Sequence, residues 1–291
     1  MMTFNEFRDY AKGAILDYLP EEYFGAEVCL TDIQKLDDSY TGMILKQEHK
    51  SSSPIINLEQ CFKQYEEKTP IEELMLKMAR TITTSQLAVD EASLMDYEKC
   101  KSQLFIRLAP ISGNEVILES SPCKIIGDIL LTYHVFFPTE DDGFYSARVS
   151  NQLIEDWGIS EEKLHEDAVE STTKLFPPTI MTLVEAATGV ADDECDVLVV
   201  SNEQMIFGAA ALFIPSVTSE VVERLGGGFI AIPSSVHEWL VISTNSELRL
   251  KDLRETLKQN NQTVVRPEDI LSWVPYYYSA EEGVFHALGN R

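Results

Sequence analysis

Residues 194–243 constrain the fold most strongly, because they hold four predicted hydrophobic strands within a short span. The segment is ECDVLVVSNEQMIFGAAALFIPSVTSEVVERLGGGFIAIPSSVHEWLVIS. We interpret it as strand, tight turn, strand, short helix, strand, bend and strand. Hydrophobic strands that follow one another so closely need a common buried face. The segment therefore predicts a packed sheet.

Capping signals predict the helices. Thr3 and Glu6 form a capping box ahead of apolar residues at helical spacing, and Pro70 occupies the first position of a second helix. Ser160 is expected to cap a further helix whose first turn is acidic, and Leu250 begins the apolar stripe of another. Other strands are predicted at residues 26–34, 40–47, 104–108, 126–137, 145–149, 276–279 and 284–288.

Tight turns join most neighbouring strands, as Asp142-Gly143 does, and tight turns produce antiparallel pairs. We therefore predict an α+β fold with mixed, largely antiparallel sheets and helices packed on them. The acidic stretch of small residues at 188–194 predicts a soft boundary. It separates an N-terminal α+β region, residues 1–190, from a C-terminal α+β region, residues 191–291, as two sub-domains that share an interface. Whether the two regions share one core stays open.

Charge limits the classes of partner. The 291 residues include 48 acidic and 23 basic side chains, which gives a formal net charge of −25. Such a surface repels the phosphate backbone, so nucleic-acid binding is not expected. The simpler explanation of the charge is that it keeps the protein solvated. The functional explanation is that the protein binds a protein partner with a basic surface.

Cysteine usage and hydropathy indicate a compartment. The five cysteines are odd in number and far apart, without a CxxC pair: Cys29, Cys61, Cys100, Cys123 and Cys195. This pattern predicts reduced thiols rather than a disulfide framework or a zinc site. No signal peptide is recognised at residues 1–13, and the longest apolar stretch, residues 205–215, is too short to span a membrane. The sequence therefore predicts a cytoplasmic protein with no membrane contact.

Metal and cofactor signatures are not recognised in the sequence. The five histidines form neither an HExxH nor an HxH pattern. The triple glycine at residues 226–228 follows a predicted helix and precedes a strand, which is the reverse of the order in a phosphate-binding loop. We therefore predict no metal and no cofactor.

The polar cluster at residues 233–238 is the best candidate for a site. Ser234 and Ser235 end a predicted strand, and a bend there could bring a hydroxyl to His237 as nucleophile and base. Glu238 points to the other face if the strand is regular. Pro-Ser-Ser is also ordinary turn chemistry, and His237 could simply bond a backbone carbonyl. We prefer this structural interpretation and keep Ser234, Ser235, His237 and Glu238 as candidate site residues.

Several sequence blocks carry a family resemblance. In order along the chain they are FNEFRDYAKGAILDYLPEEY, RLAPISGNEVILESSPCKIIGDILLTYHVFF, VSNQLIEDWGISEEKLHEDAVESTTKLFP, LVVSNEQMIFGAAALFIP, IAIPSSVHEWLVI and RPEDILSWVPYYYS. This order resembles the bacterial domain-of-unknown-function family 5688, with a weaker similarity to family 1444. Residues 233–238 fit the family pattern, whereas residues 122–124 and 170–173 depart from it. The resemblance implies no reaction, substrate or catalytic residue.

Three functional hypotheses follow. The leading one is a non-enzymatic protein-interaction module, because no coherent catalytic signature is recognised and the surface is acidic. The first alternative is a hydrolase-like enzyme that uses Ser234 or Ser235 with His237. The second alternative is an acidic inhibitor that mimics nucleic acid and blocks a basic protein.

Overall fold

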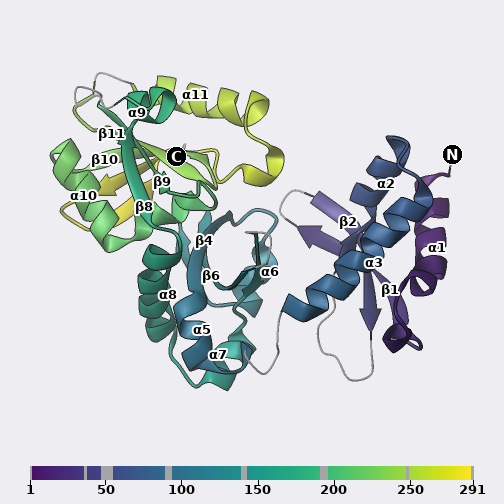
Figure 1. Cartoon of the computed structure of the whole chain (residues 1–291). Coiled ribbons are helices and arrows are strands. Elements are labelled where there is room, and N and C mark those ends of the chain that lie inside the picture. Colours follow the sequence, from purple (N-terminus) through teal and green to yellow (C-terminus); the bar gives the residue numbers. More distant parts are fainter. Residues whose placement is uncertain are drawn as a thin grey trace. The chain divides into compact units, whose positions relative to one another are not determined.

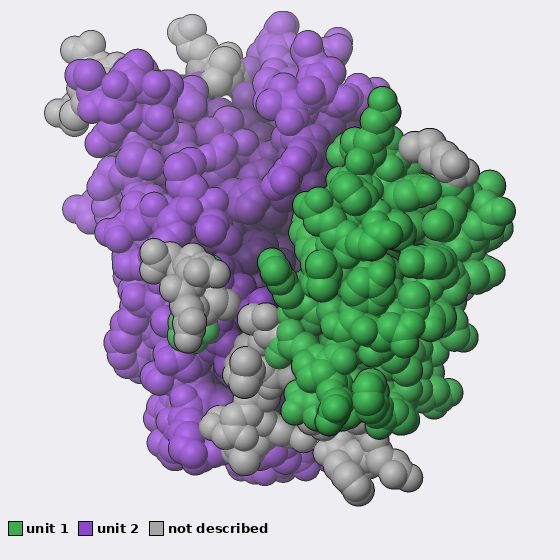
Figure 2. Space-filling view, turned by 45° about the vertical axis from the view of Figure 1, so that its right-hand side comes forward, with its two compact units in different colours: residues 1–92, 138–143 green, residues 93–137, 144–291 purple. Residues whose placement is uncertain are grey.

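The computed structural model describes residues 2–35, 38–46, 55–88, 94–138, 143–190, 196–246 and 249–289. The chain divides into two compact units, residues 1–92 with 138–143 and residues 93–137 with 144–291 (Figure 2). Both units combine helices with antiparallel strands (Figure 1), so the predicted α+β class is confirmed.

The first unit packs helices against a small sheet. Its described strands pair in the order β1-β2-β3. The elements are α1 (Phe4–Ala14), β1 (Glu27–Lys35), β2 (Asp38–Lys46), β3 (Ile56–Asn57), α2 (Leu58–Glu66) and α3 (Ile71–Ala88). The predicted capping box is present, because Glu6 N–H donates to Thr3 Oγ1 and Thr3 N–H donates to the Glu6 carboxylate. A separate hydrophobic core, which includes Phe7, Met43 and Leu74, joins these elements.

The second unit begins with a sheet in the order β4-β6-β5, and β7 also pairs with β6. Its elements are α5 (Tyr97–Cys100), β4 (Leu104–Pro110), α6 (Glu115–Ser120), β5 (Cys123–Ile126), β6 (Ile129–Pro138), β7 (Phe144–Arg148), α7 (Asn151–Trp157) and α8 (Glu161–Leu175). The strand predicted at residues 126–137 therefore begins later, because Gly127 and Asp128 turn the chain from β5 into β6. Of the predicted hairpin turn, Asp142 lies outside the described residues.

The second sheet of this unit runs β13-β12-β10-β11-β9-β8 in the described part of the chain. Its elements are β8 (Pro178–Thr182), α9 (Leu183–Thr188), β9 (Val197–Asn202), η4 (Gly208–Phe213), α10 (Pro215–Leu225), β10 (Phe229–Ser235), β11 (Glu238–Ser243), α11 (Leu250–Thr263), η5 (Pro267–Asp269), β12 (Tyr276–Ser279) and β13 (Val284–Ala287). The predicted hairpin near the end of the sequence is confirmed by the pairing of β12 with β13.

One prediction for residues 194–243 was wrong. The second of the four strands is instead the short 3₁₀ helix η4, so this segment supplies β9, β10 and β11 to the sheet. The residues from Gly208 to Leu212 are all buried. A short run that is apolar on every side has no periodicity that separates a buried strand from a buried helix.

The core of the second unit is shared by its two sheets. One hydrophobic cluster contains Leu108 and Tyr133 of the first sheet together with Val200, Trp239 and Tyr276 of the second. The boundary expected at residue 190 falls inside this unit. On either side of it β8 and β9 pair with each other from Pro178–Asn202 to Thr182–Leu198.

His165 gives this unit a pH-dependent stability. Its Nδ1 lies 3.1 Å from the Tyr133 hydroxyl, and burial, with Lys124 nearby, lowers the pKa of His165 to about 4. The unfolded chain binds this proton at a pKa of about 6.5 and the folded chain only near 4. Between these values the unfolded state holds more protons, so the free energy of unfolding falls as the pH decreases.

We expect one such histidine to contribute up to about 1.4 kcal/mol per pH unit across that window. Urea unfolding of the wild type and of His165→Gln at pH 7 and pH 5 measures the contribution. The wild type should lose more stability than His165→Gln, whereas His286→Gln, at an exposed histidine, should behave like the wild type. An equal loss in the wild type and His165→Gln would contradict the assignment.

Candidate functional site

The turn between β10 and β11 positions the four predicted site residues. The register of the pair shifts between Pro233 and Ser235, which marks a bulge. Ser234 Oγ donates to Glu238 Oε1 at 2.9 Å, and the backbone N–H of His237 donates to Ser235 Oγ at 3.0 Å. Because of the bulge, Ser234 and Glu238 meet across the turn.

The imidazole of His237 is held on both nitrogens. The backbone N–H of Phe207 donates to Nδ1 at 3.1 Å, which places the ring proton on Nε2. Nε2 lies 3.2 Å from Asp269 Oδ1, and Arg266 contacts the other oxygen of that carboxylate at 2.7 Å. Within the described residues, no hydrogen bond joins this ring to the Ser234 or Ser235 hydroxyl. In this arrangement the imidazole serves neither serine as a base.

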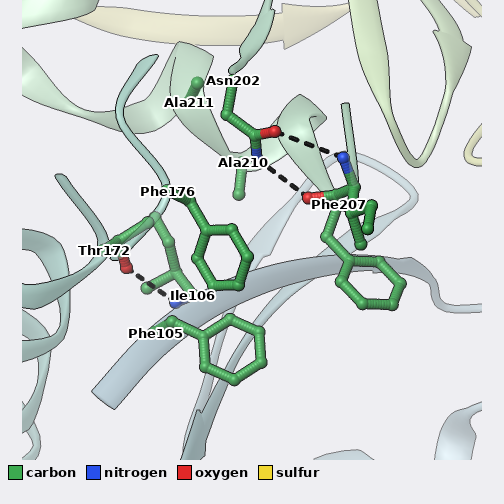
Figure 3. A pocket seen from close by; sticks show the side chains of 9 residues that line it. Phe105, Ile106, Thr172, Phe176, Asn202, Phe207, Ala210 and Ala211 are labelled. Carbon is green, nitrogen blue, oxygen red and sulfur yellow. Dashed lines mark hydrogen bonds between the residues drawn. The ribbon is translucent and has the colours of Figure 1, made fainter. Parts of the chain in front are cut away.

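Phe207 is the conformational anomaly beside His237. Its φ of 53° lies in the left-handed region, which is costly for an aromatic residue and persists only where surrounding contacts enforce it. The amide of Asn202 supplies one such contact by donating to Ile206 O at 2.8 Å and accepting from Ile206 N–H at 3.2 Å. Figure 3 shows this amide facing the chain at Phe207.

The ring of Phe207 contacts both an imidazole and a guanidinium. It stacks on His237 with centroids 6.0 Å apart and planes inclined by 23°. The guanidinium carbon of Arg107, from β4, lies 3.5 Å from its centroid. Burial lowers the pKa of Arg107 to about 10, so the side chain remains a cation at neutral pH. The stack therefore ties β4 to the turn between β10 and β11.

His134, on β6, lies in the same sheet as Arg107 of β4. Its Nε2 lies 3.0 Å from Thr132 Oγ1, while the buried Nδ1 has no hydrogen-bond partner among the residues that the structure describes. Burial, together with Arg107 and Arg148, holds the pKa of His134 well below its usual value. The ring is therefore neutral at physiological pH and contributes no positive charge to this face.

Two cavities differ in what they admit. The cavity beside Phe105, Phe176 and Phe207 (Figure 3) has a volume of about 10 Å³, enough for a single water molecule. A cavity of about 220 Å³ lies between α9, the second sheet and α11, and we call it the α9–α11 groove. Its apolar lining consists of Leu183, Val197, Ile232, Leu240, Ile242, Leu253 and Leu257, and its polar lining of Ser234, Thr256 and Asn260.

Two of the four predicted site residues, Ser234 and Glu238, are associated with this groove. Ser234 lines it directly, and Glu238 holds the Ser234 hydroxyl in place. His237 and Ser235 are bonded elsewhere in the turn. The site that the structure assembles is therefore a mostly apolar groove whose lining includes Ser234, held by Glu238. The lining residues that the structure describes contain no imidazole.

Sequence reasoning missed the partners that hold this turn. Asn202 belongs to the tight turn predicted after the first strand of residues 194–243, and no sequence pattern singles out Phe207 or Asp269. Asp269 lies 32 residues beyond His237 in the chain, so no local spacing links them. A polar residue at the end of an apolar strand, as Asn202 is in β9, is the one signal that points to this loop.

Across the described ranges, no three histidine, cysteine, aspartate or glutamate side chains gather in a way that could hold a metal ion. Among the helices that the structure describes, none combines the length and the apolar character needed to cross a membrane.

Comparisons with known proteins place the chain in a family. No curated protein and no solved structure matches it. A family described as a family of unknown function, DUF5688, matches residues 4–280, which cover nearly all of the 291 residues. The resemblance seen in the ordered sequence blocks is thereby confirmed, while the weaker similarity to family 1444 stays a prediction. The chain belongs to the family of unknown function DUF5688.

Proposed function

We propose that this protein is a non-enzymatic protein-interaction module whose docking site is the α9–α11 groove. The occupant is one large apolar side chain from a partner segment that also carries lysine or arginine. The observation that carries the proposal is the groove itself, with a volume of about 220 Å³ and a mostly apolar lining. A cavity of about 150 Å³ already accepts benzene, so this volume suits a leucine or an aromatic side chain.

The edges of the groove support a peptide partner. Leu183, at the start of α9, lines the groove and is 41% exposed, and its neighbour Val184 is 37% exposed. Exposed apolar side chains beside a concave apolar surface are typical of recognition sites. A docked segment would cover them and remove their apolar surface from water.

Charge favours a cationic segment. Glu238 accepts a hydrogen bond from the lining residue Ser234. The half-buried Glu185 and the exposed Asp196 are close in sequence to the lining residues Leu183 and Val197. The chain as a whole has a net charge of −25. A basic segment would be steered toward this surface, with an attraction that salt weakens.

The geometry also supports a role without catalysis. A Ser/His hydrolase needs a hydroxyl within hydrogen-bond reach of a free imidazole nitrogen. Here Ser234 is bonded to Glu238, and both nitrogens of His237 face Phe207 and Asp269. Binding requires no rearrangement of these contacts.

Selection of random displayed peptides on the purified protein tests this proposal. We expect enrichment of peptides that hold one large apolar residue flanked by lysine or arginine, with binding that weakens as salt rises. Thr256→Trp, at an exposed lining position, fills the groove and should reduce the affinity of the selected peptides at least about tenfold, or 1.4 kcal/mol.

The matched control is Gln262→Trp, which adds the same side chain to an exposed position of α11 outside the groove lining. It should leave peptide affinity unchanged, and circular dichroism should show that both variants are folded. Equal binding to Thr256→Trp and the wild type, or selection of peptides without basic residues, would refute the proposal.

A further inference from the structure

The first unit contains a separate cavity, and we infer that it binds a small organic carboxylate with an apolar body. The cavity has a volume of about 300 Å³ and lies between α2, α3 and β3. This site is independent of the α9–α11 groove, which belongs to the second unit. Its volume reaches the lower end of the range for small-molecule pockets.

One wall of the cavity is apolar. Ile56, Leu74 and Met78 line it and are at most 5% exposed, so they belong to the core of the unit. Cys61 also lines it, and burial raises the pKa of this thiol to about 11 even though Lys77 opposes the shift. The thiol is therefore neutral at physiological pH, and this wall suits an alkyl or aryl group.

The lining also supplies a cation and hydrogen-bond donors, because Lys77 is exposed on α3, the helix that carries Leu74 and Met78. Lys77, on α3, donates from Nζ to Gln64 Oε1 on α2 at 2.9 Å. No carboxylate forms an ion pair with Lys77 in the described part of the chain, although the sequence has 48 acidic side chains against 23 basic ones. Gln60 also lines this cavity.

The apolar and the polar lining residues together define the chemistry of the ligand. An ammonium group retains two further donor hydrogens when one is directed at Gln64, and a carboxylate accepts such charge-assisted bonds. The ligand carboxylate would therefore contact Lys77, while its apolar body lies against Leu74 and Met78. A cationic ligand would be repelled by Lys77, and a neutral amide would lose the charge-assisted bond.

Methyl NMR of the full chain, labelled with ¹³C at the methionine methyl groups, tests this inference with phenylacetate as the probe. Met78 lines the cavity, whereas Met181, on β8, lies in the other unit. The two resonances are assigned with Met78→Leu and Met181→Leu. We expect phenylacetate to shift the Met78 resonance saturably at low millimolar concentration and to leave Met181 unchanged.

Variants and analogues separate this site from non-specific binding. Lys77→Gln should weaken phenylacetate binding at least tenfold, while Lys63→Gln, at an exposed position of α2 outside the lining, should bind like the wild type. Phenylacetamide should bind at least tenfold more weakly than phenylacetate. The inference is overturned if Met78 shows no saturable shift up to about 10 mM, if Lys77→Gln binds equally well, or if the amide binds as tightly as the acid.

Discussion

Replacing Gly208 with alanine should lower the free energy of unfolding of the second unit by about 3 kcal/mol. A Cβ at this position would lie 2.5 Å from the carbonyl oxygen of His237 and 2.8 Å from the backbone nitrogen of Asn202. Both neighbours are main-chain atoms, one at the end of β9 and one in the turn between β10 and β11. They therefore cannot rotate away as the end of a side chain would. The added methyl group must separate η4 from β9 and from the turn that carries His237.

Urea unfolding followed by tryptophan fluorescence measures this loss. Trp239 is fully buried and donates from Nε1 to Ala209 O, so its emission reports on the contact between η4 and β11. The matched control is Gly289→Ala, where a Cβ would meet nothing within 4 Å. The control should unfold like the wild type, and a Gly208→Ala variant within 0.5 kcal/mol of the wild type would show that η4 is not confined as described.

Replacing Asp128 with alanine is expected to cost about 3 kcal/mol, because it removes the polar joint between the two sheets. Ser272 Oγ donates to both carboxylate oxygens, at 3.0 and 2.9 Å, and the Tyr276 hydroxyl donates to Oδ1. Tyr276 is fully buried and Ser272 is 2% exposed, so both hydroxyls would lose a charged partner away from water. The Tyr276 hydroxyl also accepts from Asp128 N–H at 3.2 Å.

Asp128→Asn removes the negative charge but keeps the size of the side chain, so it tests the two contributions separately. The amide oxygen still accepts a hydrogen bond from one hydroxyl. In the same urea experiment, the free energy of unfolding of Asp128→Asn should therefore lie between that of the wild type and that of Asp128→Ala. Glu119→Ala, at an exposed acidic residue of α6 in the same unit, serves as the control and should change stability little. If Asp128→Ala and Glu119→Ala unfold alike, the joint between the sheets does not depend on this carboxylate.

Elements with local signals could be predicted from the sequence. Thr3 and Glu6 start α1, Ser160 caps α8, and Gly158 ends α7 in the left-handed conformation, each through contacts within a few residues. Elements whose conformation depends on contacts with distant residues could not be predicted from the sequence. The turn at Gly127 depends on a close approach to Tyr276, and the shape of η4 depends on burial from all sides.

The candidate site follows the same division. A bend at residues 233–238 could be predicted from Pro-Ser-Ser and the two flanking strands, although a regular strand would place Glu238 on the other face. The hydrogen bonds within this turn could not be predicted, because the partners of His237 are distant in sequence. Phe207 directly precedes η4, and Asp269 is the last residue of η5. Nothing in a single sequence encodes that a bulge pairs Ser234 with Glu238, or that α11 leaves a groove beside them.

The strand order of the larger sheet has a consequence for synthesis on the ribosome. The described helices and strands of the first unit's core lie within residues 4–88, so this core is synthesised before that of the second unit. The second unit needs β12 beside β10, and Tyr276 must reach Asp128, before its core is complete. Nascent chains therefore carry an unfinished sheet edge at β10 until the segment containing β12 has left the exit tunnel, which is the interval when a holding chaperone has most to protect.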